Sequence, residues 1–127
     1  MNSLVIDMTH GGVKIAVSLA KKDETVYAYD IYNTLKSVDK KMLDVYNVKV
    51  IDLDYLNNLN GNLRVIYPVH LPLTKRDIEK YNPSLNYTFL THHEIIKELL
   101  KNWGNDIPLK LQELKEKPAV FLCLKKF

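Results

Sequence analysis

The chain has 127 residues and a net charge of +3, with 46% hydrophobic and 26% charged residues. These values are typical of one soluble globular domain and exclude disordered and fibrous proteins. The apolar runs are too short to span a bilayer, and the charge is too small to indicate a nucleic-acid-binding protein. One cysteine, Cys123, and the lack of a signal-peptide pattern favour a reduced, cytoplasmic setting.

Six short runs rich in β-branched and aromatic residues predict strands. In chain order they cover 3–8, 25–30, 48–53, 63–69, 87–91 and 119–124. Their hydrophobicity is continuous rather than alternating, which is typical of strands covered on both faces in a parallel sheet. The turn-rich stretch 57–62 predicts a loop between the third and fourth runs.

Helical patterns separate these runs. Apolar residues recur at helical spacing over 13–20 and most clearly over 95–103, while short or basic helices are predicted over 74–81 and 109–114. Thr91, with Glu94 three residues later, has the pattern of a capping box at the start of a helix. A weaker stripe after Ser37 predicts one more helix and consists of Val38, Met42, Val45 and Tyr46.

Strands that alternate with helices predict an α/β domain with an open, parallel, Rossmann-like sheet and helices on both faces. We expect the strand order 3-2-1-4-5, with the sixth run at an edge. The chain is expected to form one domain over residues 1–127, with a core over 1–117 and a terminal strand within 118–127.

All four histidines follow predicted strands. His10 follows the first strand, His70 ends the fourth, and His92 and His93 follow the fifth. Ligands of open parallel sheets bind beyond the carboxyl ends of the strands, near the point where strand order reverses. The expected topology therefore gathers the histidines at one edge of the sheet. The alternative is that loops attract polar residues whatever their function.

The turns after the first two strands carry further candidates. Gly11 and Gly12 let the backbone turn tightly and present N–H groups at a helix N-terminus, where an anion is favoured. Asp30 ends the second strand 19 residues beyond Gly11, where Rossmann proteins keep a carboxylate for a ribose hydroxyl. The alternative role for Asp30 is a helix or loop cap. Tyr32 offers an aromatic face in the next turn.

No catalytic or metal-binding residue is predicted. Adjacent histidines on a helix point about 100° apart, so only one of His92 and His93 could join the other histidines around a metal. Cys123 lies in an apolar run away from the histidines, and no phosphate-binding Gly-x-x-x-x-Gly-Lys loop occurs.

Four segments, 4–12, 27–32, 68–72 and 91–94, carry a family resemblance. Together they resemble the N-terminal domain of the Mur-ligase-like proteins of methanogenic archaea. These proteins are relatives of the UDP-N-acetylmuramoyl-peptide ligases, and one of them closes the final ring of the nickel tetrapyrrole coenzyme of methanogenesis.

The resemblance implies a three-domain ligase in which ATP phosphorylates a carboxylate and a nucleophile attacks the acyl-phosphate. ATP and Mg²⁺ would be held by the central domain, so this chain is expected to carry no cofactor and to be non-catalytic. It would be an isolated piece of the ligase or a stand-alone relative that binds substrate. The residues expected at the substrate are Thr9, His10, Gly11, Gly12, Asp30, Tyr32, His70, Thr91, His92 and His93.

The first loop has fewer glycines than in bacterial Mur N-terminal domains, since only Gly11 and Gly12 remain. This departure argues against a UDP-sugar and favours another small anion, such as a polycarboxylate.

The expected partners are the other two domains of the parent protein. No nucleic acid and no membrane is expected as a partner. The run 119–124 could pair within its own sheet, and the alternative is that it forms a homodimer with a second copy. The alternative functions are a stand-alone nucleotide- or dinucleotide-binding module and a protein-interaction domain.

Overall fold

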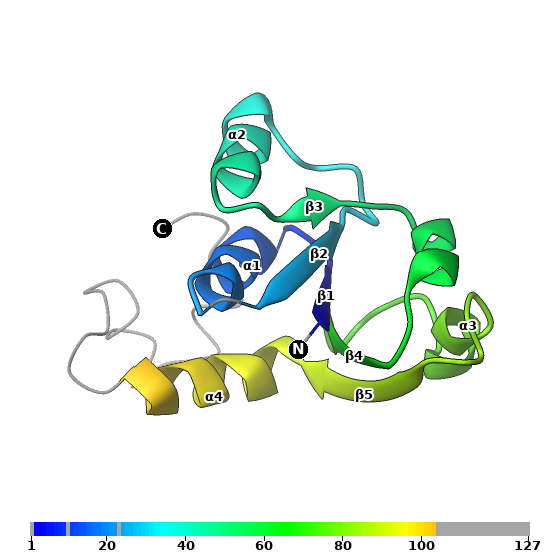
Figure 1. Cartoon of the computed structure of the whole chain (residues 1–127). Helices are drawn as coiled ribbons and strands as arrows, with labels where there is room; N and C mark the ends of the chain where they lie inside the picture. Colours follow the sequence, from blue (N-terminus) through cyan, green and yellow to red (C-terminus); the bar gives the residue numbers. More distant parts are fainter. Residues whose placement is uncertain (1, 10, 23, 104–127) are drawn as a thin grey trace.

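The computed structural model describes residues 2–9, 11–22 and 24–103 (Figure 1). Its five strands form one parallel sheet in the order β3-β2-β1-β4-β5, which confirms the predicted order. The predicted strand over 119–124 and helix over 109–114 lie outside the described residues. The strands are β1 (Asn2–Ile6), β2 (Thr25–Tyr29), β3 (Lys49–Val50), β4 (Asn62–Tyr67) and β5 (Asn86–Thr91).

Helices cover both faces of the sheet, as predicted (Figure 1). The α-helices α1 (Gly12–Ala20), α2 (Ser37–Val45) and α4 (His92–Trp103) pack on one face, against side chains such as Val5 and Ile66. The short helix α3 (Lys75–Glu79) and the 3-10 helix η1 (Leu53–Asn58) pack on the other face. Within the described ranges, no helix is long and apolar enough to cross a membrane.

The helix after β2 forms where it was predicted, but its predicted apolar stripe is wrong. Val38 and Val45 are 64% and 74% exposed, whereas Leu43 is fully buried. α2 lies at the margin of the sheet, beside β3, so only a narrow face of the helix contacts the core. Leu43 lies on this face, and Met42 is partly buried next to it. The two valines lie on the outer side.

Several strand boundaries also differ from the prediction. The first strand ends at Ile6 rather than at Met8, because Asp7 has a positive φ of 73° and turns the chain. The third strand covers only Lys49–Val50, because the chain then turns into the unpredicted helix η1, which buries Leu53 and Leu56. The fourth strand ends at Tyr67, before Pro68, which has no N–H to donate, and Val69 is 58% exposed.

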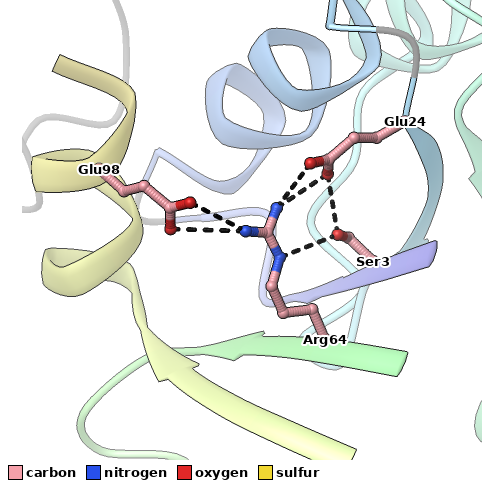
Figure 2. A network of polar contacts seen from close by, with 4 residues as sticks. All are labelled: Ser3, Glu24, Arg64 and Glu98. Atoms are coloured by element: carbon pink, nitrogen blue, oxygen red, sulfur yellow. Dashed lines mark hydrogen bonds and ion pairs between the residues drawn. The ribbon is translucent and has the colours of Figure 1, made fainter. Parts of the chain in front are cut away.

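A network of charged side chains joins four elements near the amino ends of the strands (Figure 2). Arg64 on β4 lies beside Ser3 on β1. Its guanidinium donates to both carboxylate oxygens of Glu24, at 2.8 and 2.9 Å, and to Glu98 on α4 at 3.2 Å. Its Nε donates to the Ser3 hydroxyl at 3.4 Å, and this hydroxyl donates to Glu24 at 3.0 Å. One arginine therefore ties β1, β4, the start of β2 and α4 together.

We expect the loss of Arg64 to lower the free energy of unfolding more than the loss of the Glu98 charge. The Arg64 and Glu24 side chains are only 11% and 21% exposed, whereas Glu98 is 44% exposed. Arg64→Ala should lower the free energy of unfolding by about 3 kcal/mol, because it leaves a largely buried carboxylate without its cation. Glu98→Gln should cost less than about 1 kcal/mol, as surface ion pairs do. Urea denaturation of both variants measures the difference; equal losses would contradict this account.

Candidate functional site

The order of the strands reverses between β1 and β4. The chain leaves β1 toward α1 on one face and leaves β4 toward α3 on the other face. Three connections therefore meet beyond the carboxyl ends of β1, β4 and β5. We call residues 7–9, 11–12, 68–75 and 91–94 the carboxyl edge. In open parallel sheets this is the position at which ligands bind.

The turn after β1 is built around Asp7. This residue is fully buried and has a positive φ of 73°. Its N–H donates to the Tyr29 carbonyl at 3.0 Å, so it is tied to the end of β2. Its carboxylate accepts hydrogen bonds from the Thr9 amide, at 2.9 Å, and from the Thr9 hydroxyl. The Thr9 side chain is therefore engaged within the turn, and the negative charge of Asp7 lies beneath it.

Glycine is required at both positions that start α1. Gly11 has a φ of 83°, in the left-handed region that glycine adopts without strain. A Cβ on Gly12 would overlap the Asp7 carbonyl oxygen and lie 2.9 Å from its carbon. The first helical bond runs from the Ile15 amide to the Gly11 carbonyl at 3.0 Å, so the amides before Ile15 have no acceptor within the helix. The first turn carries no acidic residue.

His92 connects α4 to the end of β1. Its ring is 1% exposed, and its Nε2 lies 2.9 Å from the Ile6 carbonyl oxygen. A carbonyl oxygen only accepts, so Nε2 carries the proton. His92 thus has a structural role within the carboxyl edge.

The predicted capping box at Thr91 and Glu94 is confirmed. The Thr91 amide donates to the Glu94 carboxylate at 3.0 Å, and the Glu94 amide donates to the Thr91 hydroxyl at 3.2 Å. The hydrogen bond from the Thr91 backbone, and after it one from the Thr91 hydroxyl at 3.1 Å, hold the pKa of Glu94 below its ordinary value of 4.5, and Lys75 and Lys97 add to the effect.

Asp30 acts as a cap of its own loop, the second of the two roles considered from the sequence. Its carboxylate accepts from the Thr34 amide and hydroxyl, at 3.0 and 3.1 Å, and from the Leu35 amide at 2.8 Å. Tyr32 lies in the same loop and is 45% exposed. Both residues follow β2, so they lie on the side of β1 away from β4.

The other histidines differ in their surroundings. His70 is exposed in the connection from β4 to α3, and His93 is half-buried in the first turn of α4. His10 lies outside the described residues. The strand order thus brings part of the candidate set together at the carboxyl edge: Thr9, Gly11, Gly12, His70, Thr91, His92 and His93.

Lys75 also belongs to the carboxyl edge, although the sequence did not single it out. Its ammonium lies 5.8 Å from the centre of the Tyr67 ring and 5.5 Å from that of Phe89, within the range of a cation–π interaction. The sequence showed Lys75 only as one charge in a short helix. Its position follows from the packing of α3 against the ends of β4 and β5.

Within the part of the chain that the structure describes, no three His, Cys, Asp or Glu side chains converge as a metal site requires. No protein-family model matches this chain, and no curated protein matches it significantly. The resemblance to Mur ligases therefore depends on the four short segments alone.

We expect Gly12→Ala to destabilise the fold by about 3 kcal/mol, the upper end of the usual cost of overpacking, because backbone atoms of Asp7 occupy the place of the new methyl group. Gly61→Ala is the matched control. Gly61 also has a positive φ, 84°, but no atom lies within 4 Å of the place that its new methyl group would take, so only strain of about 1 kcal/mol applies. Thermal unfolding of both variants compares them, and a Gly12 variant as stable as the control would contradict the argument.

The capping box of α4 should make stability depend on pH. Because folding lowers the pKa of Glu94, the ionised carboxylate stabilises the folded state fully above about pH 4.5. This stabilisation falls as the pH drops through the lowered pKa and is absent below it. Glu94→Gln keeps an acceptor without the charge, so the difference in urea midpoint between the parent and this variant should shrink from pH 6 to pH 3. A constant difference would show that the charge of Glu94 has no role.

Proposed function

We propose that this chain binds a small anionic ligand at the carboxyl edge and is the non-catalytic, substrate-binding domain of an ATP-dependent ligase of the Mur type. The observation that carries the proposal is the reversal of strand order between β1 and β4. The connections on its two sides leave for opposite faces, which is the arrangement that binds ligands in sheets of this kind.

Backbone amides and one lysine at the carboxyl edge support an anion. The start of α1 offers backbone amides and no acidic side chain. Lys75 adds a positive charge at the ends of β4 and β5. The carboxylates nearby are engaged by the protein itself: Asp7 by Thr9, and Glu94 by Thr91. The support for an anion therefore comes from the α1 amides and Lys75, and not from the balance of charge, since two carboxylates lie beside this one lysine.

The engagement of Asp30 favours a polycarboxylate over a nucleotide. A dinucleotide-binding module needs a carboxylate that accepts from the ribose hydroxyls. Both oxygens of Asp30 instead accept hydrogen bonds from Thr34 and Leu35. The two-glycine turn also offers less open backbone than a pyrophosphate loop.

In the proposed ligase, the described residues bind and orient the substrate. Activation of a carboxylate as an acyl-phosphate, with its ATP and Mg²⁺, is assigned to the central domain of the parent. The family resemblance extends the proposal to the nickel tetrapyrrole coenzyme of methanogenesis.

Titration calorimetry with tricarballylate, UDP and AMP tests this function. We expect tricarballylate to bind, and Lys75→Met to weaken its binding about tenfold because one charged hydrogen bond is lost. Lys80→Met is the matched control: Lys80 lies at the end of the same helix, its side chain is 78% exposed, and it faces Asp77. This control should bind as the parent does.

Three results would count against the proposal. Heat from UDP or AMP alone would favour the nucleotide-binding alternative. If none of the three ligands gives heat at millimolar concentration, the proposal that this edge binds a ligand is excluded. An equal loss of tricarballylate affinity in Lys75→Met and Lys80→Met would show that any lost positive charge weakens binding, wherever it lies.

A further inference from the structure

β5 forms one edge of the sheet, and its edge is long and uncharged. Its six residues, Asn86–Thr91, read Asn-Tyr-Thr-Phe-Leu-Thr and include no charge, proline or glycine. The opposite edge, β3, has two residues, one of them Lys49. Proteins usually protect edge strands by shortness, charge or proline, because free backbone groups pair with other strands. Only the β3 edge has this protection.

The structure shows which backbone groups of β5 face outward. The Asn86 amide donates to the Gly61 carbonyl at 2.9 Å, toward β4. Backbone groups in a parallel strand alternate in direction, so those of 86, 88 and 90 face β4, and those of Tyr87 and Phe89 face the free edge. The Thr91 amide is already bound by Glu94. Tyr87 and Phe89 thus offer the amides that are available for pairing.

Among the described elements, none covers this edge (Figure 1). The helix that follows β5, α4, packs on α1 and thus over the interior of the sheet. A sixth strand that followed α4 and lay parallel outside β5 would make a left-handed crossover, since α4 is on the same face as α1. Such crossovers are almost always right-handed. A parallel strand directly after α4 is therefore a poor partner for β5.

We propose that β5 pairs antiparallel with β5 of a second copy of this chain, about a two-fold axis that passes between the two copies of Thr88 and is perpendicular to the sheet. Tyr87 then lies opposite the partner's Phe89, and Phe89 lies opposite the partner's Tyr87. Each of these pairs exchanges two N–H···O bonds, which uses every outward-facing amide that is available. The two sheets become one.

The side chains fit this register. Tyr87 and Phe89 are already stacked within β5, with ring centres 5.7 Å apart, and pairing adds their counterparts across the axis. Aromatic pairs and Thr–Thr pairs are favourable neighbours between strands, and no like charges face each other. A register centred on Phe89 would instead need the Thr91 amide, which is bound in the cap of α4.

Disulfide cross-linking tests the register in the full chain with Cys123→Ser as background. In the proposed dimer, residue 88 of one copy lies opposite residue 88 of the other, in a pair without hydrogen bonds. The Cα atoms of such a pair are about 4.5 Å apart, which is within the range of a disulfide. Thr88→Cys should form covalent dimers on mild oxidation. Asn86→Cys should not, because each residue 86 faces residue 90 of the other copy. Equal cross-linking of both variants, or none, overturns the proposed pairing.

Sedimentation equilibrium tests the interface without cysteine chemistry. The parent should show a monomer–dimer equilibrium, and Thr88→Lys should weaken association at least about tenfold, because two lysines then face each other. Thr88 is exposed, so the fold should tolerate the change. Val50→Lys is the matched control, since it adds the same charge to the opposite edge, at a residue that is 46% exposed. A parent that stays monomeric, or association lost only with Val50→Lys, overturns the proposal. Neither result bears on ligand binding at the carboxyl edge.

Discussion

The close approach of Gly12 to the Asp7 carbonyl is the constraint on which the carboxyl edge depends. It lets α1 begin directly against the end of β1, with Gly11 in a left-handed conformation before it. The same tight turn places Asp7 beneath Thr9 and leaves the Ile6 carbonyl to accept from His92. The start of α1 therefore depends on one contact that admits no side chain, and His92 ties the start of α4 to the end of the same strand.

The two ends of the sheet are built on different principles. Near the amino ends of the strands, Arg64 is bound directly by two carboxylates, those of Glu24 and Glu98. At the carboxyl edge, the carboxylates are consumed by helix caps and turns, while Lys75 lies over aromatic rings. The amino ends are thus joined by ion pairs between side chains, and the carboxyl edge is held by local caps and turns.

Local patterns in the sequence predicted most of the fold, because strand order and the α4 cap depend on nearby residues and on general rules of handedness. The helix η1 was missed because Leu53 and Leu56 continue an apolar run that is equally typical of a strand. Arg64 and Lys75 could not be placed, since their contacts come from distant parts of the chain; Arg64 and Glu24 are 40 residues apart. The sequence predicted which turns meet at the candidate site. It did not predict which side chains there are engaged by other parts of the protein, because those contacts depend on tertiary packing.

The two proposed surfaces share one physical link. Pairing of β5 would use the backbone of Tyr87 and Phe89 and would leave the Thr91 amide in the cap of α4. The hydrogen bonds of the carboxyl edge would therefore be the same in monomer and dimer. The Phe89 ring takes part on both sides, since it lies beneath Lys75 and would contact the partner's Tyr87. Coupling between assembly and anion binding through this ring is limited to about 1 kcal/mol, because the contact is a weak cation–π interaction.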